Sequence, residues 1–191
     1  MELFHFYTDL GFWHVIDKNG LDHFYFIVTL ALPFAFKESK KLIGWVTLFT
    51  LGHTLSLIGN FYVEISFSSY WIELLIPITI ALSALSLLYD KGRFQHAQQH
   101  LFFAVITLLF GIIHGLGFGR YFQMLIPEDA VSLSLFSFAV GVELAQLVIV
   151  LFVLLLNTVV VQLMNRSKDK WRFLVGAMIF SQALTMIFER I

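Results

Sequence analysis

The stretch LFGIIHGLGFG, residues 109 to 119, places one histidine and four glycines inside one of the most apolar parts of the chain. Gly111, Gly115 and Gly119 recur every four residues, the small-residue spacing that lets a second helix pack closely inside a membrane. His114 can then face another helix instead of lipid, and an imidazole in that position is a candidate functional group. The stretch therefore predicts a packed helix of a membrane bundle.

The composition is that of a membrane protein. Hydrophobic residues make up 59% of the 191 residues and charged residues 13%, against roughly 45–50% and about 25% in ordinary globular proteins. The net charge of −1 provides no basic field for a nucleic acid, so nucleic-acid binding is excluded as a function. The chain has no cysteine, so it offers neither a thiolate nucleophile nor a thiolate metal site.

Six segments are long and apolar enough to cross a bilayer core of about 30 Å as helices. We expect an all-α, polytopic membrane protein in which residues 1–191 form a single transmembrane domain. The predicted spans cover residues 21–36, 42–60, 71–89, 98–119, 132–157 and 171–188. In segment 1–18, apolar residues recur at helical spacing, which predicts a short interfacial helix lying in the membrane surface.

The basic residues between the spans predict the orientation. Nine of the 12 lysines and arginines follow the first, third and fifth spans. They are Lys37, Lys40, Lys41, Lys91, Arg93, Arg166, Lys168, Lys170 and Arg172. By the positive-inside rule these segments face the cytoplasm, so both termini face outward from a bacterial-type inner membrane.

Ionisable and polar side chains inside the spans are the candidate functional residues, because such groups are costly to bury in hydrocarbon. Counted at about 1.5 Å per residue, they gather in the outer half of the bundle and near its midplane. The candidate ligands are His14 before the first span, then Asp22, His23, His53, Glu73, His114 and Glu143. The supporting polar residues share a helical face with His53 or Glu143, and they are Thr50, Ser56, Asn60 and Gln146.

The candidate chemistry is the binding of a divalent cation. Imidazole and carboxylate without thiolate suit Ni²⁺, Co²⁺, Zn²⁺ or Mn²⁺. No span contains a lysine or arginine that could pair with Glu143 near the midplane, and a cation would compensate its charge. Hydrogen bonding between helices is the competing interpretation for any single histidine, but the convergence of several histidines and carboxylates favours a ligand.

The ordered set of these segments resembles the HupE/UreJ family of membrane proteins, which is associated with nickel and cobalt uptake. The similar segments are GLDHFYF (20–26), FTLGHTLSL (49–57), WIELLIPITIALSAL (71–85) with Glu73, FGIIHGLGFG (110–119) and FAVGVELAQL (138–147). The resemblance implies that His14, Asp22 and His23 act in metal entry. The nine positions between His14 and His23 depart from the shorter spacing typical of the family.

Three functions fit the sequence. The first is a permease that captures Ni²⁺ or Co²⁺ from the outer side as its substrate, with Zn²⁺ as a further candidate ion. The second is an intramembrane zinc-dependent hydrolase, in which histidines hold the metal and a carboxylate acts as general base. The third is a haem protein with two axial histidines. The expected partners are the lipid bilayer and the metal ion, and assembly into a homo-oligomer stays open.

Overall fold

The structure, a computed structural model, describes residues 1–18, 21–63, 68–89 and 97–191. Lys91 and Arg93, two of the residues used to predict the orientation, lie outside this part of the chain. The secondary structure within it is helical, as expected. The long helices are α1 (Glu2–Ile16), α2 (Asp22–Ala31), α3 (Ser39–Val63), α4 (Ser69–Tyr89), α5 (Ala97–Leu125), α6 (Val131–Asn157) and α7 (Lys168–Phe188). Short turns of helix, η1 (Phe36–Glu38) and η3 (Glu128–Ala130), precede α3 and α6, and the π-helical η4 (Thr158–Leu163) extends α6.

Five of the described helical segments are long and apolar enough to cross a membrane, so the protein is a multi-pass membrane protein. They are Phe36–Val63, Ser69–Tyr89, Phe103–Leu125, Val131–Leu163 and Lys168–Phe188. Their side chains follow the pattern of a bundle in lipid, with apolar groups outside and polar groups inside. Leu51 and Leu55 on α3 are each 53% exposed, whereas His53 between them is 1% exposed.

The predicted continuous span over residues 21–36 is wrong. Helix α2 ends at Ala31 and has 10 residues, which gives a length of about 15 Å, half of a bilayer core. Pro33 is the reason, because proline has no backbone N–H with which to continue the helical hydrogen bonds; Leu32 still has helical backbone and donates to the carbonyl of Val28.

The carbonyl groups released at this break have partners from elsewhere in the bundle. The side chain of Asn157 donates to the carbonyls of Leu32 and Phe34 at 3.1 and 3.2 Å, and the ammonium of Lys168 donates to the carbonyl of Pro33 at 2.7 Å. The indole of Trp171 in turn donates to the side-chain oxygen of Asn157 at 2.9 Å. A helix end inside a membrane needs such partners, because hydrocarbon supplies none.

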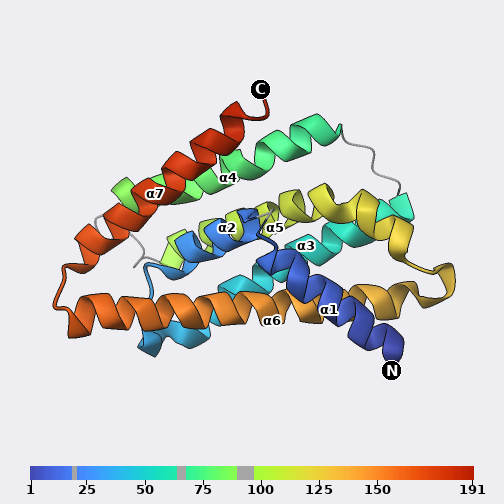
Figure 1. Ribbon diagram of the computed structural model, residues 1–191, viewed down its shortest axis with the longest axis horizontal. Coiled ribbons are helices and arrows are strands. Elements are labelled where there is room, and N and C mark those ends of the chain that lie inside the picture. The colour runs from blue at the N-terminus through green and yellow to red at the C-terminus, as the bar shows by residue number, and fades with distance from the viewer. Residues whose placement is uncertain (19–20, 64–67, 90–96) are drawn as a thin grey trace.

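Segment 1–18 forms a helix, as predicted, and this helix packs tightly against α6. A methyl group added at Gly11 would overlap the carbonyl of Phe138, and one added at Gly141 would overlap the carbonyl of Thr8. The hydroxyl of Tyr7, a residue only 1% exposed, donates to the carbonyl of Leu125 at 2.6 Å. Figure 1 shows α1 and α2 following each other along α6, with the connection between them near the middle of the bundle. The interfacial position itself stays a prediction.

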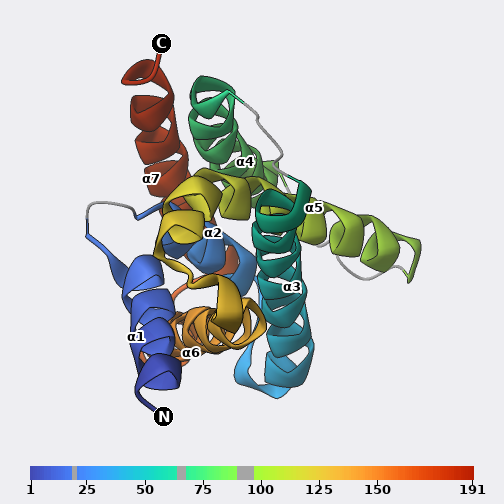
Figure 2. The ribbon, with the colours of Figure 1, turned by 90° about the vertical axis from the view of Figure 1, so that its right-hand side faces the viewer.

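The remaining helices pack in pairs, α3 with α5 and α4 with α7 (Figures 1 and 2). Gly111, Gly115 and Gly119 lie at the contact between α3 and α5. A methyl group at Gly111 would overlap the carbonyl of Phe49, one at Gly115 the backbone of His53, and one at Gly119 the amide of Asn60. This close approach of α3 and α5 brings His53 and His114 into the same part of the interior.

Candidate metal centre

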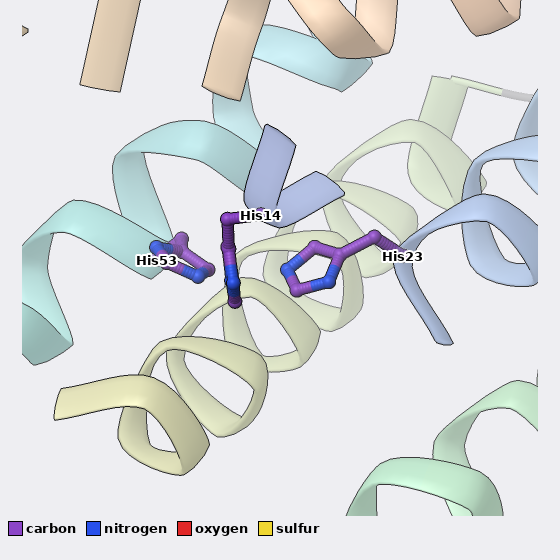
Figure 3. Close-up of side chains that lie close together, drawn as sticks. All are labelled: His14, His23 and His53. Atoms are coloured by element: carbon purple, nitrogen blue, oxygen red, sulfur yellow. The ribbon is translucent and has the colours of Figure 1, made fainter. Parts of the chain in front are cut away.

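Four histidines from four helices meet inside the bundle. His14 comes from the last turn of α1, His23 from the first turn of α2, His53 from α3 and His114 from α5. We call His14, His23, His53 and His114 the histidine cluster. The ring centroid of His23 lies 4.8 Å from that of His14, 5.4 Å from that of His53 and 5.2 Å from that of His114. Figure 3 shows the rings of His14, His23 and His53 pointing toward one another.

The break between α1 and α2 positions two of these side chains. The chain leaves helix α1 after Ile16 and enters helix α2 at Asp22, so His14 and His23 flank the connection. Side chains radiate outward from a helix axis, and nine residues of helix separate two of them by about 13.5 Å along that axis, so one continuous helix could not bring both rings to a single point. The spacing of His14 and His23 is therefore accommodated by their lying on two separate helices.

Hydrogen bonds fix two of the rings. The Nδ1 atom of His114 lies 2.8 Å from the carbonyl oxygen of Phe110, and the Nδ1 atom of His23 lies 3.2 Å from a carboxylate oxygen of Asp22. Since a carbonyl can only accept, the proton of the neutral His114 ring is on Nδ1, and its Nε2 carries a lone pair. Such a bond from the second ring nitrogen is the usual way of orienting a metal-binding histidine.

The Nε2 atoms of all four histidines are buried and have no hydrogen-bond partner. His23, His53 and His114 are each at most 2% exposed, so water does not reach their rings freely. A buried polar atom without a partner costs about 1–3 kcal/mol. The cluster thus presents several unsatisfied acceptors in one place, which is the arrangement that a bound cation would satisfy.

The distances fit a metal ion after a small closing movement. Ligand atoms of His14, His23 and His53 all lie within 4.8 Å of one another. Nitrogens that bind one first-row metal at about 2.0–2.1 Å lie roughly 3.3 Å apart in a tetrahedral site. Rotation of the rings toward one another by about 1–1.5 Å would therefore complete a three-nitrogen site, with His114 beside it.

Aromatic rings enclose the cluster. The ring centroid of Phe118 lies 4.0 Å from that of His14, and the ring centroid of Phe49 lies 5.3 Å from that of His114. Phe138 is 6.1 Å from His53 and stacks on Phe118 at 5.3 Å. Sequence reasoning did not identify these residues, although Phe118 follows His114 by four positions and therefore lies on the same helical face. Such walls exclude water and strengthen electrostatic interactions at the site.

The other predicted ligands occupy different positions. Asp22 lies at the cluster, where its carboxylate also accepts the backbone N–H of His23 at 2.9 Å. Glu143 lies outside the cluster, where its carboxylate accepts hydrogen bonds from the hydroxyls of Thr47, at 2.7 Å, and of Thr50. The side chain of Glu73 is exposed on α4 and is not brought to the histidines.

The predicted supporting residues are all buried on the interior faces of α3 and α6. The hydroxyl of Thr50 lies 3.0 Å from the side-chain oxygen of Gln146, which is 0% exposed. The hydroxyl of Ser56 donates to the carbonyl of His53 at 2.7 Å, and Asn60 is 5% exposed beside Gly119. Thr50 precedes His53 by one turn, so Thr47, Thr50, Glu143 and Gln146 form a second polar group next to the cluster.

The comparison with protein families gives a match to essentially the whole chain. The family model described as HupE / UreJ protein matches residues 1–190, so the resemblance seen in the sequence segments is confirmed. No match was found among curated proteins or among solved structures.

Proposed function

Because the chain belongs to the HupE/UreJ family, we propose that it is a membrane permease for a divalent transition-metal cation, with Ni²⁺ or Co²⁺ as the physiological substrate. One observation carries the proposal: four buried Nε2 atoms without partners gather at one point in the bundle. Imidazole nitrogens bind Ni²⁺, Co²⁺ and Zn²⁺ well, and no cysteine competes for the ion.

The first step is capture and dehydration of the ion. The carboxylate of Asp22, 19% exposed beside His23, supplies a negative charge at the edge of the cluster. The imidazoles then replace water ligands, since each neutral ring offers one nitrogen lone pair. Binding of the ion offsets the cost of burying these nitrogens, which is why we assign the cluster to the substrate rather than to packing.

We propose that α1 and α2 together make the first crossing, which would replace the interfacial position predicted for α1 from the sequence. Their 15 and 10 residues give a combined length of about 37 Å, enough for a core of about 30 Å. This arrangement keeps both termini outside and the lysine-rich segments inside, as the positive-inside rule predicts. Discontinuous helices of this kind commonly place their break at the substrate site of a transporter.

The ion would next bind at the second polar group, which is formed by Thr47, Thr50, Glu143 and Gln146. The Glu143 carboxylate accepts hydrogen bonds from the hydroxyls of Thr47 and Thr50, and it is a suitable ligand for a cation that leaves the imidazoles. A membrane potential of 100 mV would provide about 4.6 kcal/mol for the inward movement of two positive charges.

The test is uptake into liposomes that contain the purified full chain. His53→Ala and His114→Ala should each abolish ⁶³Ni or ⁵⁷Co accumulation while the protein keeps its helical circular dichroism spectrum. His5→Ala is the matched control, because His5 is an exposed histidine of α1, and it should transport like the unmodified chain. Unchanged accumulation in both cluster variants would refute the proposal.

Two measurements on the same preparation distinguish the other functions that the sequence left open. A hydrolase should retain stoichiometric, slowly exchanging zinc and should turn over lipid, whereas a permease should exchange its ion with the medium. A haem protein should show a strong visible absorption spectrum, which a nickel or cobalt permease lacks at that intensity.

A further inference from the structure

A cavity of about 450 Å³ lies at the lysine-rich end of the bundle, apart from the histidine cluster. It is bounded by α2, η1, α3, α4, α5 and α7. We call it the basic cavity. Phe26 and Phe110 separate it from the histidine cluster, because both residues line the cavity and both contact His114.

The rim of the basic cavity is cationic. Lys37, Lys41, Lys168 and Arg172 line it, against one carboxylate, that of Glu38. The Glu38 carboxylate accepts the backbone N–H of Ala35 at 3.1 Å, so part of its capacity is used locally. The field of the rim is therefore positive, and the N-terminus of α7, which begins at Lys168, adds to it.

Contacts within the fold hold part of this rim in place. The ammonium of Lys168 is fixed by its 2.7 Å bond to the carbonyl of Pro33. An ammonium has three N–H donors, so this bond positions the group without exhausting it. Arg172 is only 9% exposed, which is unusual for an arginine. Lys168 and Arg172 are thus held at the cavity wall, whereas Lys37 and Lys41 are exposed at its rim.

Much of the remaining wall of the cavity is apolar. Leu30, Phe34, Trp45, Leu87, Phe103 and Ile106 line it between α2, α3, α4 and α5, with the hydroxyl groups of Thr29, Ser83, Ser86 and Thr107 among them. The lysines and arginine of the rim would repel a cation. A ligand that combines an anionic head with a hydrocarbon chain matches both parts.

We propose that the basic cavity binds an anionic phospholipid, with its phosphate at the lysine and arginine rim and an acyl chain along the apolar wall. Basic pockets between membrane helices on the side of the basic loops are suited to such headgroups. The proposal does not depend on metal transport, because its ligand, its residues and its test are separate from the histidine cluster.

Trp45 provides the test, because an indole is quenched on contact with a brominated acyl chain. The full chain in phosphatidylcholine nanodiscs is titrated with dibrominated phosphatidylglycerol, or with dibrominated phosphatidylcholine as the zwitterionic reference. The signal from Trp45 is the difference between the unmodified chain and Trp45→Phe. We expect phosphatidylglycerol to quench Trp45 at about one tenth of the concentration that phosphatidylcholine requires.

Matched charge variants decide whether the cavity is responsible. Lys37→Gln/Lys41→Gln/Lys168→Gln should bring the two lipids to equal quenching. The double variant Lys37→Gln/Lys41→Gln keeps the bond from Lys168 to the carbonyl of Pro33. Its preference for phosphatidylglycerol over phosphatidylcholine should be several-fold smaller than that of the unmodified chain. The control removes three charges from exposed neighbours outside the cavity lining, and it is Lys40→Gln/Arg166→Gln/Lys170→Gln.

Three results would overturn the proposal. Equal quenching by the two lipids in the unmodified chain would show that the cavity does not select an anionic lipid. An equal loss in the cavity variant and the control would assign the preference to the general surface field. Displacement of the brominated lipid by soluble glycerol phosphate at a similar concentration would show that the site takes a free phosphate ester and not a lipid.

Discussion

The two ends of α2 show two opposite ways of breaking a helix inside a membrane bundle. At its C-terminal end, the carbonyls near Pro33 are satisfied by Asn157 and Lys168, and Asn157 is itself bonded to Trp171. At its N-terminal end, His23 and the three histidines around it keep buried Nε2 atoms without partners. The polar groups of the first break have partners within the chain, whereas the Nε2 atoms at the second have none, and the proposed function assigns that place to a metal ion.

This difference suggests a criterion for this protein: buried polar groups with partners stabilise the fold, and a cluster of buried polar groups without partners is a candidate binding site. A buried polar group without a partner costs about 1–3 kcal/mol, and the cluster contains four such nitrogens. At Pro33 the fold supplies partners for the released backbone carbonyls. At the histidine cluster it supplies none for the Nε2 atoms, and under the proposed function a bound cation would recover this cost.

The largest effect expected from this comparison is the loss of metal response in His53→Leu. Leucine keeps most of the volume and removes one unsatisfied nitrogen, so stability without metal should be unchanged or higher. Ni²⁺ at about 100 times its Kd should stabilise the unmodified chain by about 2.7 kcal/mol, and His53→Leu should weaken binding at least a hundredfold and lose this gain.

Thermal unfolding in detergent, with and without Ni²⁺, measures this effect. His5→Leu is the control, since His5 is exposed on α1, and its metal-dependent shift should equal that of the unmodified chain. A full metal-dependent shift in His53→Leu would contradict the functional interpretation of the N-terminal break.

Asn157→Leu should have the next largest effect. It should lower stability and leave the response to metal unchanged. It leaves the carbonyls of Leu32 and Phe34 and the indole of Trp171 without their partners, so we expect stability to fall by about 2–3 kcal/mol. The shift produced by Ni²⁺ should remain, because the histidine cluster is intact. Gln162→Leu, at an exposed position of η4, controls for the added apolar surface. An equal loss of stability in this variant would show that the hydrogen bonds of Asn157 are not the cause.

Asp22→Asn sharpens the comparison at the functional end. The carboxylate bonds to Nδ1 of His23 and adds a negative charge, and loss of such a partner typically costs 10- to 100-fold in metal affinity. Isothermal titration with Ni²⁺ should show this loss without a change in stoichiometry. Asp9→Asn removes an exposed carboxylate from α1 and should leave the affinity unchanged, so equal losses in the two variants would indicate only a change of net charge.

The sequence was sufficient for the helices that are long and uniformly apolar. Five of the six predicted spans correspond to helices able to cross a membrane, because hydropathy over about 20 residues reports directly on burial in lipid. The first span could not be predicted correctly from hydropathy, because residues 24–36 are almost uniformly apolar while Pro33 ends the helix at Ala31. For predicting where this helix ends, Pro33 is a stronger signal than the hydropathy of the segment.

The sequence predicted a site of histidines and carboxylates, but only some of the predicted residues lie in the histidine cluster. His53 and His114 followed from the polar residues of two spans, and Gly111 and Gly115 indicated that a second helix packs closely on the span of His114, without identifying that helix as the span of His53. The association of Glu143 with Thr47 and Thr50 was beyond the sequence, because helical rise gives the depth of a residue and not the rotation of its helix. For the same reason depth alone did not reveal that Glu73 is exposed.

Trp171→Phe should give the smallest effect and tests the structural end of α2 most finely. Phenylalanine keeps one aromatic ring but is smaller than indole, and it removes the N–H that donates to the side-chain oxygen of Asn157 at 2.9 Å. Since the amide N–H groups of Asn157 still donate to Leu32 and Phe34, we expect a loss of only about 1 kcal/mol, measured by thermal unfolding. The double variant Trp171→Phe/Asn157→Leu should be no less stable than Asn157→Leu alone, because the indole has no partner left to lose. Additive losses would show that Trp171 stabilises the fold through packing, and the chain of hydrogen bonds that completes the Pro33 break would then end at Asn157.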